Sequence, residues 1–248
     1  MNSKEKIINQ LDSVAYIDFH IHLEDQSPDD LQDSVLYLAN SIDRESYNAT
    51  LALAEKHRNV IALPGIHPAR SETETWPLHL LEKIFSRSAL TGEMGLDFFW
   101  IEDRSHDSRQ REIFRSQLEL SSKYKCVPSI HTKGAEQEVL DLLKEYGIQK
   151  SVVHWYSGPL ELIPSYLDQG ARFTIGPDIF KGSEVWKHIP PERIFAETDN
   201  PTGIPWILNK DARADDIVMI YRELALKLGE KEEKIINRLK KNMIDLLD

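Results

Sequence analysis

The sequence contains almost no cysteine and no long apolar run. Cys126 is the one cysteine among 248 residues, so neither a disulfide framework nor a cluster of thiolate metal ligands can form. No apolar stretch approaches the roughly 20 residues that a membrane span needs. The first residues, MNSKEKIINQ, begin a helical pattern and lack the apolar core of a secretory signal. We therefore expect a soluble, cytoplasmic protein without a membrane partner, in which any metal is held by imidazoles and carboxylates.

Positive charge is also scarce. The chain has 30 lysines and arginines against 41 aspartates and glutamates, a formal net charge of −11. Broad non-specific binding to nucleic acid depends on many contacts between cations and phosphates, and this composition argues against it. A nuclease that engages one strand end stays compatible, because metal ions can neutralise phosphate at the point of reaction.

The chain lacks the features that mark a domain boundary. It has no low-complexity linker, no long glycine and serine stretch and no block of like charge. Its length suits one α/β barrel and leaves no room for a second full domain. Residues 1–248 are therefore predicted to form a single domain.

Short runs rich in β-branched and apolar residues alternate with longer segments of helical periodicity, which is typical of repeated βα units. Several of these runs are almost continuously apolar, as buried parallel strands are. Eight candidate strands are predicted at 14–22, 35–41, 60–66, 89–93, 126–131, 151–155, 172–176 and 194–199. They predict an α/β fold, a TIM (β/α)8 barrel.

The remaining segments fit the outer layer of such a barrel. Segments 109–125 and 137–146 have apolar residues at helical spacing, which places them in the ring of outer helices. Helical sequence from 217 to the C-terminus is expected to cover the barrel. The acidic segment 24–33 is short, so we expect a shortened first βα connection and a distorted barrel.

Ligand-type side chains fall where the predicted strands end. His20 and His22 are two residues apart, so on a strand both point the same way. The carboxyl ends of barrel strands converge on one face, where active sites occur. A lone histidine at a strand end is more often structural, but several charged groups cannot cluster there without a compensating partner. The predicted metal ligands are His20, His22, Glu93, His131, His154 and Asp199.

This ligand set suits particular metals and a particular chemistry. Imidazoles and carboxylates together hold zinc, manganese or magnesium, and a carboxylate such as Glu93 can bridge two ions. Two ions a few ångströms apart can activate a water and stabilise the leaving oxygen of a displacement. We therefore predict two divalent metal ions and a hydrolase.

Other polar residues at the same face each have two possible roles. His67 precedes a proline in a turn, and Asp97 can cap the segment that follows it, so each has a structural role open to it beside a role in substrate binding. Glu197 lies two residues before Asp199 and can either orient a metal ligand or form a hydrogen bond with Lys133.

Aromatic residues also gather on the predicted loops of this face. They can stack on unpaired bases, or they can pack the rim of the barrel. Rim packing is expected for most of them, with Trp155 and Tyr156 as the expected substrate contacts. The residues concerned are Phe98, Phe99, Trp100, Trp155, Tyr156 and Trp206.

With these residues in hand, nearly the whole chain resembles the TatD family of metal-dependent deoxyribonucleases, within the amidohydrolase-like barrels. The resemblance lies in ordered motifs: DFHIH at 18–22, GIHP at 65–68, GEMGLD at 92–97, QREIFRSQLEL at 110–120, SIHTKG at 129–134, HWYSG at 154–158 and ETDNP at 197–201.

The resemblance implies a role for each matching position. One metal would be held by His20, His22 and Asp199, the other by His131 and His154, and Glu93 would bridge them. His67 would contact the substrate phosphate, and Asp199 is the expected general base. The implied activity is hydrolysis of DNA phosphodiester bonds, often as a 3′-to-5′ exonuclease with magnesium, manganese or zinc, on a single strand or a strand end.

The chain departs from the family pattern at three places. The segment after DFHIH is short, Lys133 stands where an arginine is usual, and PTGIPWIL replaces the usual continuation after the last motif. Lysine binds phosphate as a point charge, without the two-pronged hydrogen bonding of arginine. The short front and the stretch FTIGPDIF resemble TatD-like members of bacterial anti-phage Qat systems, which suggests a nuclease subunit with protein partners.

Two alternatives to a deoxyribonuclease stay open on the sequence. TatD-like proteins include hydrolases of ester or amide bonds, such as deacylases of transfer RNA. The second alternative is a subunit that uses the barrel only as a binding surface, although the complete ligand set argues against it.

Overall fold

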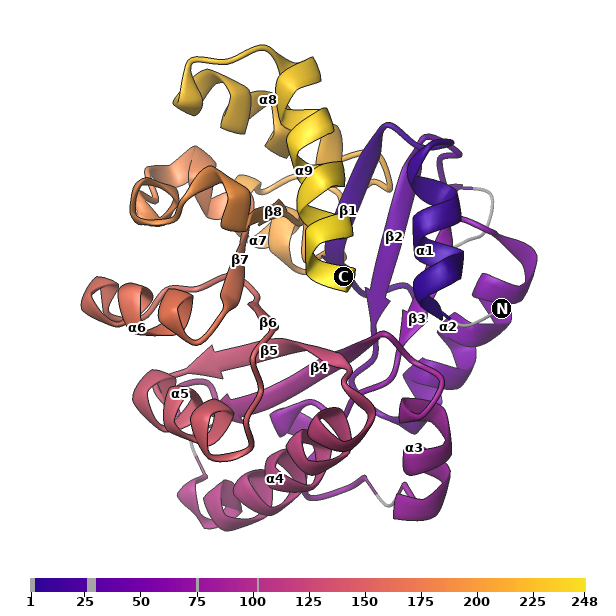
Figure 1. Cartoon of the computed structure of the whole chain (residues 1–248), viewed down its shortest axis with the longest axis vertical. Helices are drawn as coiled ribbons and strands as arrows, with labels where there is room; N and C mark the ends of the chain where they lie inside the picture. Colours follow the sequence, from indigo (N-terminus) through magenta and orange to yellow (C-terminus); the bar gives the residue numbers. More distant parts are fainter. Residues whose placement is uncertain (1–2, 26–29, 75, 102) are drawn as a thin grey trace.

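In the computed structural model, which describes residues 3–25, 30–74, 76–101 and 103–248, the strands form a central ring and most helices lie outside it (Figure 1). Every strand pair is parallel, which confirms the predicted α/β class. The strands are β1 Tyr16–Ile21, β2 Val35–Asn40, β3 Val60–Leu63, β4 Leu90–Asp97, β5 Val127–Lys133, β6 Ser151–Val153, β7 Ala171–Ile175 and β8 Ile194–Ala196.

The helices follow the predicted βα order. The predicted outer helices appear as α4 and α5, and α8 and α9 form the C-terminal tail. The α-helices are α1 Ser3–Leu11, α2 Arg44–Lys56, α3 Leu78–Phe85, α4 Asp107–Tyr124, α5 Glu136–Glu145, α6 Ile163–Asp168, α7 Gly203–Leu208, α8 Ile217–Leu228 and α9 Glu232–Leu247. None of these helices combines the length and apolarity that crossing a bilayer requires.

The strand boundaries differ from the predicted ones at the carboxyl ends. β4 and β5 run further than predicted, to Asp97 and Lys133, whereas β6 and β8 stop at Val153 and Ala196. His154 and Asp199 therefore lie just beyond their strands. The first βα connection is short as predicted, because the described residues 22–25 and 30–34 contain no α-helix.

The ring of strands is not one continuous ladder. One sheet has the order β1-β2-β3 and the other the order β4-β5-β6-β7-β8. Backbone hydrogen bonds outside the ladders bridge the gap between β3 and β4: the Gly92 N–H donates to Pro64 C=O (2.8 Å), and the Glu93 N–H donates to Ser41 C=O (2.8 Å). The barrel-like arrangement is thus kept by irregular backbone contacts.

The gap between β8 and β1 is bridged in the same way. The Asp199 N–H donates to His20 C=O (2.9 Å), and the His22 N–H donates to Asn200 C=O (2.8 Å). Below them the fully buried Asp18 carboxylate accepts hydrogen bonds from the backbone N–H (3.0 Å) and hydroxyl (2.6 Å) of Thr198. These bonds fix the ends of the first and last strands side by side.

Apolar side chains form two clusters, one inside the strands and one outside. The inner cluster contains Ile17 and Phe19 of β1, and it is covered by Ile7 of α1 and Met243 of α9. The outer cluster packs the strands against the surrounding helices. Of the predicted tail, α9 therefore closes one end of the barrel together with α1 (Figure 1), whereas α8 packs in the outer cluster.

Irregular pairing in two strands changes which side chains face inward. The register shifts between Asp18 and Ile21 in β1 and between Thr91 and Met94 in β4. Plain alternation would put Ile21 with Ile17 and Phe19, yet Ile21 packs in the outer cluster. The shift in β1 turns the following histidines inward, and the shift in β4 does the same for Glu93.

Two glutamines in the motif QREIFRSQLEL, which lies on α4, have a structural role. Gln110 and Gln117 are buried and seven residues apart, on one face of the helix. Each amide exchanges a pair of hydrogen bonds with one backbone residue: Gln110 with Asp97 (2.9 and 3.0 Å) and Gln117 with Ile66 (2.8 and 3.0 Å). The helix thereby holds the segments at the carboxyl ends of β3 and β4.

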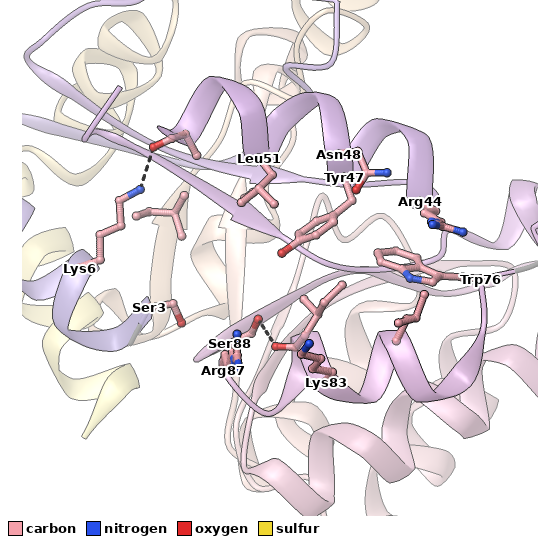
Figure 2. A pocket seen from close by; sticks show the side chains of 15 residues that line it. Ser3, Lys6, Arg44, Tyr47, Asn48, Leu51, Trp76, Lys83, Arg87 and Ser88 are labelled. Carbon is pink, nitrogen blue, oxygen red and sulfur yellow. Dashed lines mark hydrogen bonds between the residues drawn. The ribbon is translucent and has the colours of Figure 1, made fainter. Parts of the chain in front are cut away.

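The outer wall between α2 and α3 carries a separate cavity of about 560 Å³ (Figure 2). Tyr47 and Trp76 pack against each other there, with ring centroids 5.4 Å apart. At its other end the Lys6 ammonium donates to Ala54 C=O (3.2 Å) and Val60 C=O (3.0 Å), which ties α1 to the end of α2. None of the predicted site residues lines this cavity.

Replacing Gln117 with alanine is expected to destabilise the fold strongly. The change leaves the buried N–H and C=O of Ile66 without partners, and each unsatisfied group costs about 1–3 kcal/mol. We expect the free energy of unfolding, measured by urea titration, to fall by about 2–4 kcal/mol in Gln117→Ala. The matched control Gln137→Ala, on the exposed face of α5, should change it by less than about 0.5 kcal/mol. Equal stability of the two variants would contradict the proposed role of Gln117.

Candidate metal centre

The six predicted metal ligands converge at the carboxyl ends of the strands. His20 is the penultimate residue of β1, Glu93 lies in β4 and His131 in β5, while His154 and Asp199 follow β6 and β8. His20 is fully buried and Glu93 is 3% exposed, so the cluster lies at the bottom of the barrel mouth. Residues far apart in the sequence thus form one group of imidazoles and carboxylates.

One set of donor atoms has the spacing of metal ligands. His20 Nε2 lies 3.3 Å from His22 Nε2 and 3.3 Å from Glu93 Oε2. His22 Nε2 lies 3.6 Å from Glu93 Oε2 and 3.4 Å from Asp199 Oδ1, and His20 Nε2 lies 3.7 Å from that Asp199 oxygen. Donors placed about 2.0–2.1 Å from a tetrahedral ion are about 3.4 Å apart, so His20, His22 and Asp199 have the spacing of ligands to one cation, with Glu93 Oε2 close to both histidines.

The second oxygen of Glu93 faces a different set of imidazoles. Glu93 Oε1 is 2.8 Å from His131 Nδ1, 2.9 Å from His154 Nε2 and 3.5 Å from His67 Nε2. The nitrogens of His131 and His154 are 3.4 Å apart. Each carboxylate oxygen therefore belongs to its own group of histidine nitrogens, which is the arrangement of a bridging carboxylate.

The donor set fits a divalent metal for an electrostatic reason. The Nε2 atoms of His20 and His22 face each other at 3.3 Å, and because His22 Nδ1 donates to Asn40 C=O, the Nε2 lone pair of a neutral His22 points into this space, where it needs a proton or a cation. The deeply buried Nδ1 of His154 also has no hydrogen-bond partner among the described residues. The cluster is thus able to bind metal, and three groups of its residues bring their donor atoms within 4.8 Å of one another.

Hydrogen bonds to the far side of the rings orient the ligands. His22 Nδ1 donates to Asn40 C=O at 3.0 Å, which leaves the Nε2 lone pair for a metal. His20 Nδ1 lies 3.3 Å from the Ser129 hydroxyl. Neither Asn40 nor Ser129 was predicted, because a backbone carbonyl or a strand serine leaves no distinctive pattern in the sequence.

Asp97, the last residue of β4, orients His131. Its Oδ2 is 3.1 Å from His131 Nε2, and its Oδ1 accepts hydrogen bonds from the N–H groups of Phe99 (2.9 Å) and Trp100 (2.7 Å). The side chain is buried, so it departs from the predicted substrate contact and agrees with the capping alternative. Asp97 holds His131 and the loop after β4 in one arrangement.

Glu197 is buried beside His154. Its Oε1 accepts a hydrogen bond from the backbone N–H of Trp155 (2.9 Å) and lies 3.6 Å from His154 Nδ1. Lys133 donates instead to the Ser157 hydroxyl, so the predicted alternative pairing of Glu197 with Lys133 is not formed. Glu197 places the loop that carries His154.

The protonation of the cluster follows from mutual charge. Burial opposes ionisation of Glu93, but the neighbouring histidines hold its pKa well below its usual range. Burial also opposes protonation of His22, yet the carboxylates of Asp199 and Glu93 outweigh it and raise the pKa of His22 to about 9. Burial lowers the pKa of His67 to about 3, so this imidazole is neutral. The carboxylates are ionised and attract positive charge.

Two site residues have strained backbone. Asp199 has φ +50° and Trp155 has φ +36°, a left-handed region that costs a residue with a side chain about 1–2 kcal/mol. In Asp199 this conformation accompanies the approach of the carboxylate to His20 and His22. Gly203 makes room for it, because a Cβ there would lie 3.0 Å from Asp199 Cβ and 2.3 Å from Thr198 O.

A cleft of about 600 Å³ opens above the ligands. It is lined by His131, His154 and Asp199 together with two of the predicted substrate-binding residues, Lys133 and Trp155. His67 does not line this cleft: its Nδ1 accepts a hydrogen bond from the Ala69 N–H (3.1 Å), and its Nε2 lies 3.5 Å from Glu93 Oε1. The volume is within the range of about 300–1,000 Å³ that is usual for small-ligand sites.

Tyr156 departs from its predicted place. Its side chain is 1% exposed, its hydroxyl donates to Pro159 C=O, and its ring packs against Tyr166 and Phe173. It therefore supports the loop from within and does not face the cleft.

Seven of the residues that line the cleft were not predicted as site residues, and three of them carry aromatic or acidic groups. Trp100, Trp206 and Asp178 line it, although the first two were noted among the loop aromatics. Burial raises the pKa of Asp178 to about 6.

Comparisons with known proteins agree with this geometry. The family model described as TatD related DNase matches residues 17–248. The uncharacterized metal-dependent hydrolase YabD of Bacillus subtilis is 28% identical over 212 residues, which cover 76% of this chain and 81% of the relative. The human deoxyribonuclease TATDN3 is 23% identical, and the match covers 91% of this chain and 98% of that protein.

The fold has a solved counterpart. The crystal structure of YJJV, a TatD homolog from Escherichia coli, matches with a TM-score of 0.82 at 23% identity, covering 94% of this chain and 97% of that one. This likeness supports the predicted TIM-barrel-like arrangement. Because the family model matches most of its length, the chain belongs to the TatD family and is a metal-dependent hydrolase.

Proposed function

We propose that the chain hydrolyses phosphodiester bonds in DNA with two divalent metal ions, magnesium, manganese or zinc, and removes nucleotides from a strand end in the 3′-to-5′ direction. The observation that carries this proposal is the position of Glu93, whose two oxygens face two separate groups of imidazoles. His20, His22 and Asp199 would hold one ion, His131 and His154 the other, with Glu93 as the bridge.

A DNA substrate is supported by the family and by the charge of the chain. The matching family is described as TatD related DNase, and the human relative is named a deoxyribonuclease. With a net charge of −11 the protein has little general attraction for a polyanion. A strand end whose phosphate is neutralised locally by metal ions suits such a protein better than a long duplex tract.

The residues of the site divide the work of hydrolysis. Divalent ions, when bound, polarise the phosphodiester and acidify the attacking water. Asp199 is the proposed general base: its carboxylate lies at the cleft, and hydrogen bonding to His22 and nearby imidazoles keep its pKa lowered although burial opposes this. As the water oxygen bonds to phosphorus and the phosphorus–oxygen bond to the rest of the strand breaks, Asp199 accepts the proton.

Two further side chains are placed to contact the phosphate. His67 presents Nε2 next to Glu93, and Lys133 presents its ammonium at the cleft. The neutral His67 can donate one hydrogen bond from Nε2, because its Nδ1 already accepts one from Ala69. Lys133 adds a single positive charge that is free to adjust to the substrate.

The first test is metal-dependent DNA shortening. The protein is purified with chelator, supplied with Mg²⁺, Mn²⁺ or Zn²⁺, and incubated with end-labelled single-stranded DNA. We expect stepwise shortening with metal, and a loss of more than about 100-fold in Glu93→Gln, since even the partners that orient metal ligands are worth about 10–100-fold. Glu119→Gln, on the exposed face of α4, should keep full activity. Tight metal binding without cleavage of DNA would refute a deoxyribonuclease and direct the search to transfer-RNA esters.

The second test concerns protons displaced by metal. Metal-free His22 is protonated below pH 9, because its pKa is raised to about 9, and it must lose this proton to become a ligand. Affinity for Mn²⁺ should therefore rise with pH, by about tenfold per unit for one displaced proton. Competition with a chelating dye at pH 6, 7 and 8 measures this slope. An affinity independent of pH over this range would exclude His22 as a ligand that is protonated in the metal-free protein.

A further inference from the structure

Three large aromatic side chains stand exposed together at the mouth of the cleft. Phe99, Trp100 and Trp206 are 60%, 56% and 59% exposed. Trp100 lies 4.8 Å from Phe99 and 5.9 Å from Trp206 between ring centroids, both nearly edge to face. The prediction that these residues pack the rim is therefore wrong for this group. Such an exposed aromatic patch marks a binding surface, because it leaves apolar faces in water.

The patch is continuous with the metal centre. Trp155 follows the ligand His154 directly, and its ring lies 5.6 Å from that of Trp206. Trp100, Trp155 and Trp206 line the same cleft of about 600 Å³ as His131, His154 and Asp199. A substrate whose phosphate lies on the ligands therefore has aromatic faces within reach of its neighbouring groups. We call Trp100, Trp155 and Trp206 the tryptophan wall.

The wall is held by the residues that hold the ligands. Asp97 accepts hydrogen bonds from the N–H groups of Phe99 and Trp100 with one oxygen, while the other contacts His131. On the opposite side, a Cβ on Gly203 would lie 2.9 Å from the Trp155 ring and 3.0 Å from Asp199 Cβ. The absent side chain lets Trp155 and Asp199 lie together. The hydrogen bonds of Asp97 and the missing side chain of Gly203 thus fix the distance between the tryptophan wall and the ligands.

The low positive charge of the cleft suits an unpaired base. Lys133 is the one lysine or arginine among the cleft-lining residues of the described chain, and its ammonium lies 5.6 Å from the Phe99 ring and 5.8 Å from the Trp100 ring. A duplex is bound through many cationic contacts to phosphate, which this cleft does not offer. Aromatic faces with a single cation instead suit one or two unstacked bases and the phosphate beside them.

We propose that the tryptophan wall, with Lys133, stacks the unpaired base next to the reacting phosphate and makes the enzyme select unpaired strand ends over paired ones. This inference rests on the proposed function and specifies its substrate.

The experiment compares Trp206→Ala and Trp100→Ala with wild type on two substrates, a single strand and the same strand in a blunt duplex. Stacking on one aromatic ring is worth about 1–3 kcal/mol, so KM for the single strand should rise about 5- to 150-fold, and the preference over the duplex should fall by a similar factor. Trp206→Phe, which keeps an aromatic face, should recover most of the affinity. Leu226→Ala, a similarly exposed apolar residue of α8 that does not line the cleft, should leave both substrates unaffected.

Binding is measured separately from chemistry. Fluorescence anisotropy of a labelled oligonucleotide, recorded in chelator so that cleavage is prevented, should show weaker binding to Trp206→Ala than to wild type or Leu226→Ala. If wild type cleaves DNA but both alanine variants keep its KM and its preference for the single strand, the proposed role of the tryptophan wall is refuted while the proposed function stands. If wild type with each metal cleaves neither DNA nor methyl p-nitrophenyl phosphate, a diester without a base, the proposed function fails and this inference fails with it.

Discussion

The buried negative charge of Glu93 is the constraint on which the rest of the site depends. Its carboxylate is 3% exposed, and both oxygens face imidazole nitrogens at 2.8–3.6 Å. A buried carboxylate is costly unless positive charge compensates it, and neutral imidazoles supply none. The cluster is therefore stable only with protons or metal ions among its members, which makes metal affinity a property of the fold itself.

Placing this charge requires the barrel to be irregular where it carries the ligands. The two interruptions of the ladder lie beside β1 and β4, which hold His20 and Glu93, and each of these strands also has a shift in register. A bulged strand cannot pair regularly with its neighbour. The bonds from Asp199 to His20 C=O and from Glu93 to Ser41 C=O then hold the strands together at these points. The interruptions of the ladder thus coincide with the two strands whose ligand-type side chains point into the mouth.

Regular spacing made much of this site predictable, and irregular backbone limited the rest. The two-residue spacing of His20 and His22 and the polar ends of the strands indicated where ligands gather. The register shifts in β1 and β4 leave no recognisable pattern in the sequence. The division of the strands into two separate sheets leaves none either. Tyr156 follows a residue with φ +36°, which turns its ring into the core beside Tyr166, so its burial depended on a conformation that residue types do not reveal.

The exposure of Trp100 and Trp206 was unpredictable for the same reason, and it bears on how substrate would be recognised. With a net charge of −11, the protein cannot hold a polyanion by its surface charge. In the proposed reaction, neutralisation of the phosphate would fall to the metal centre, and the uncharged faces of Trp100 and Trp206 would contact the bases. Asp97 joins the two functions, because the same carboxylate orients His131 and fixes the loop of Trp100. In the proposed reaction, a substrate that displaced this loop would therefore also disturb the position of His131, which would couple recognition of the base to the geometry of the reacting phosphate.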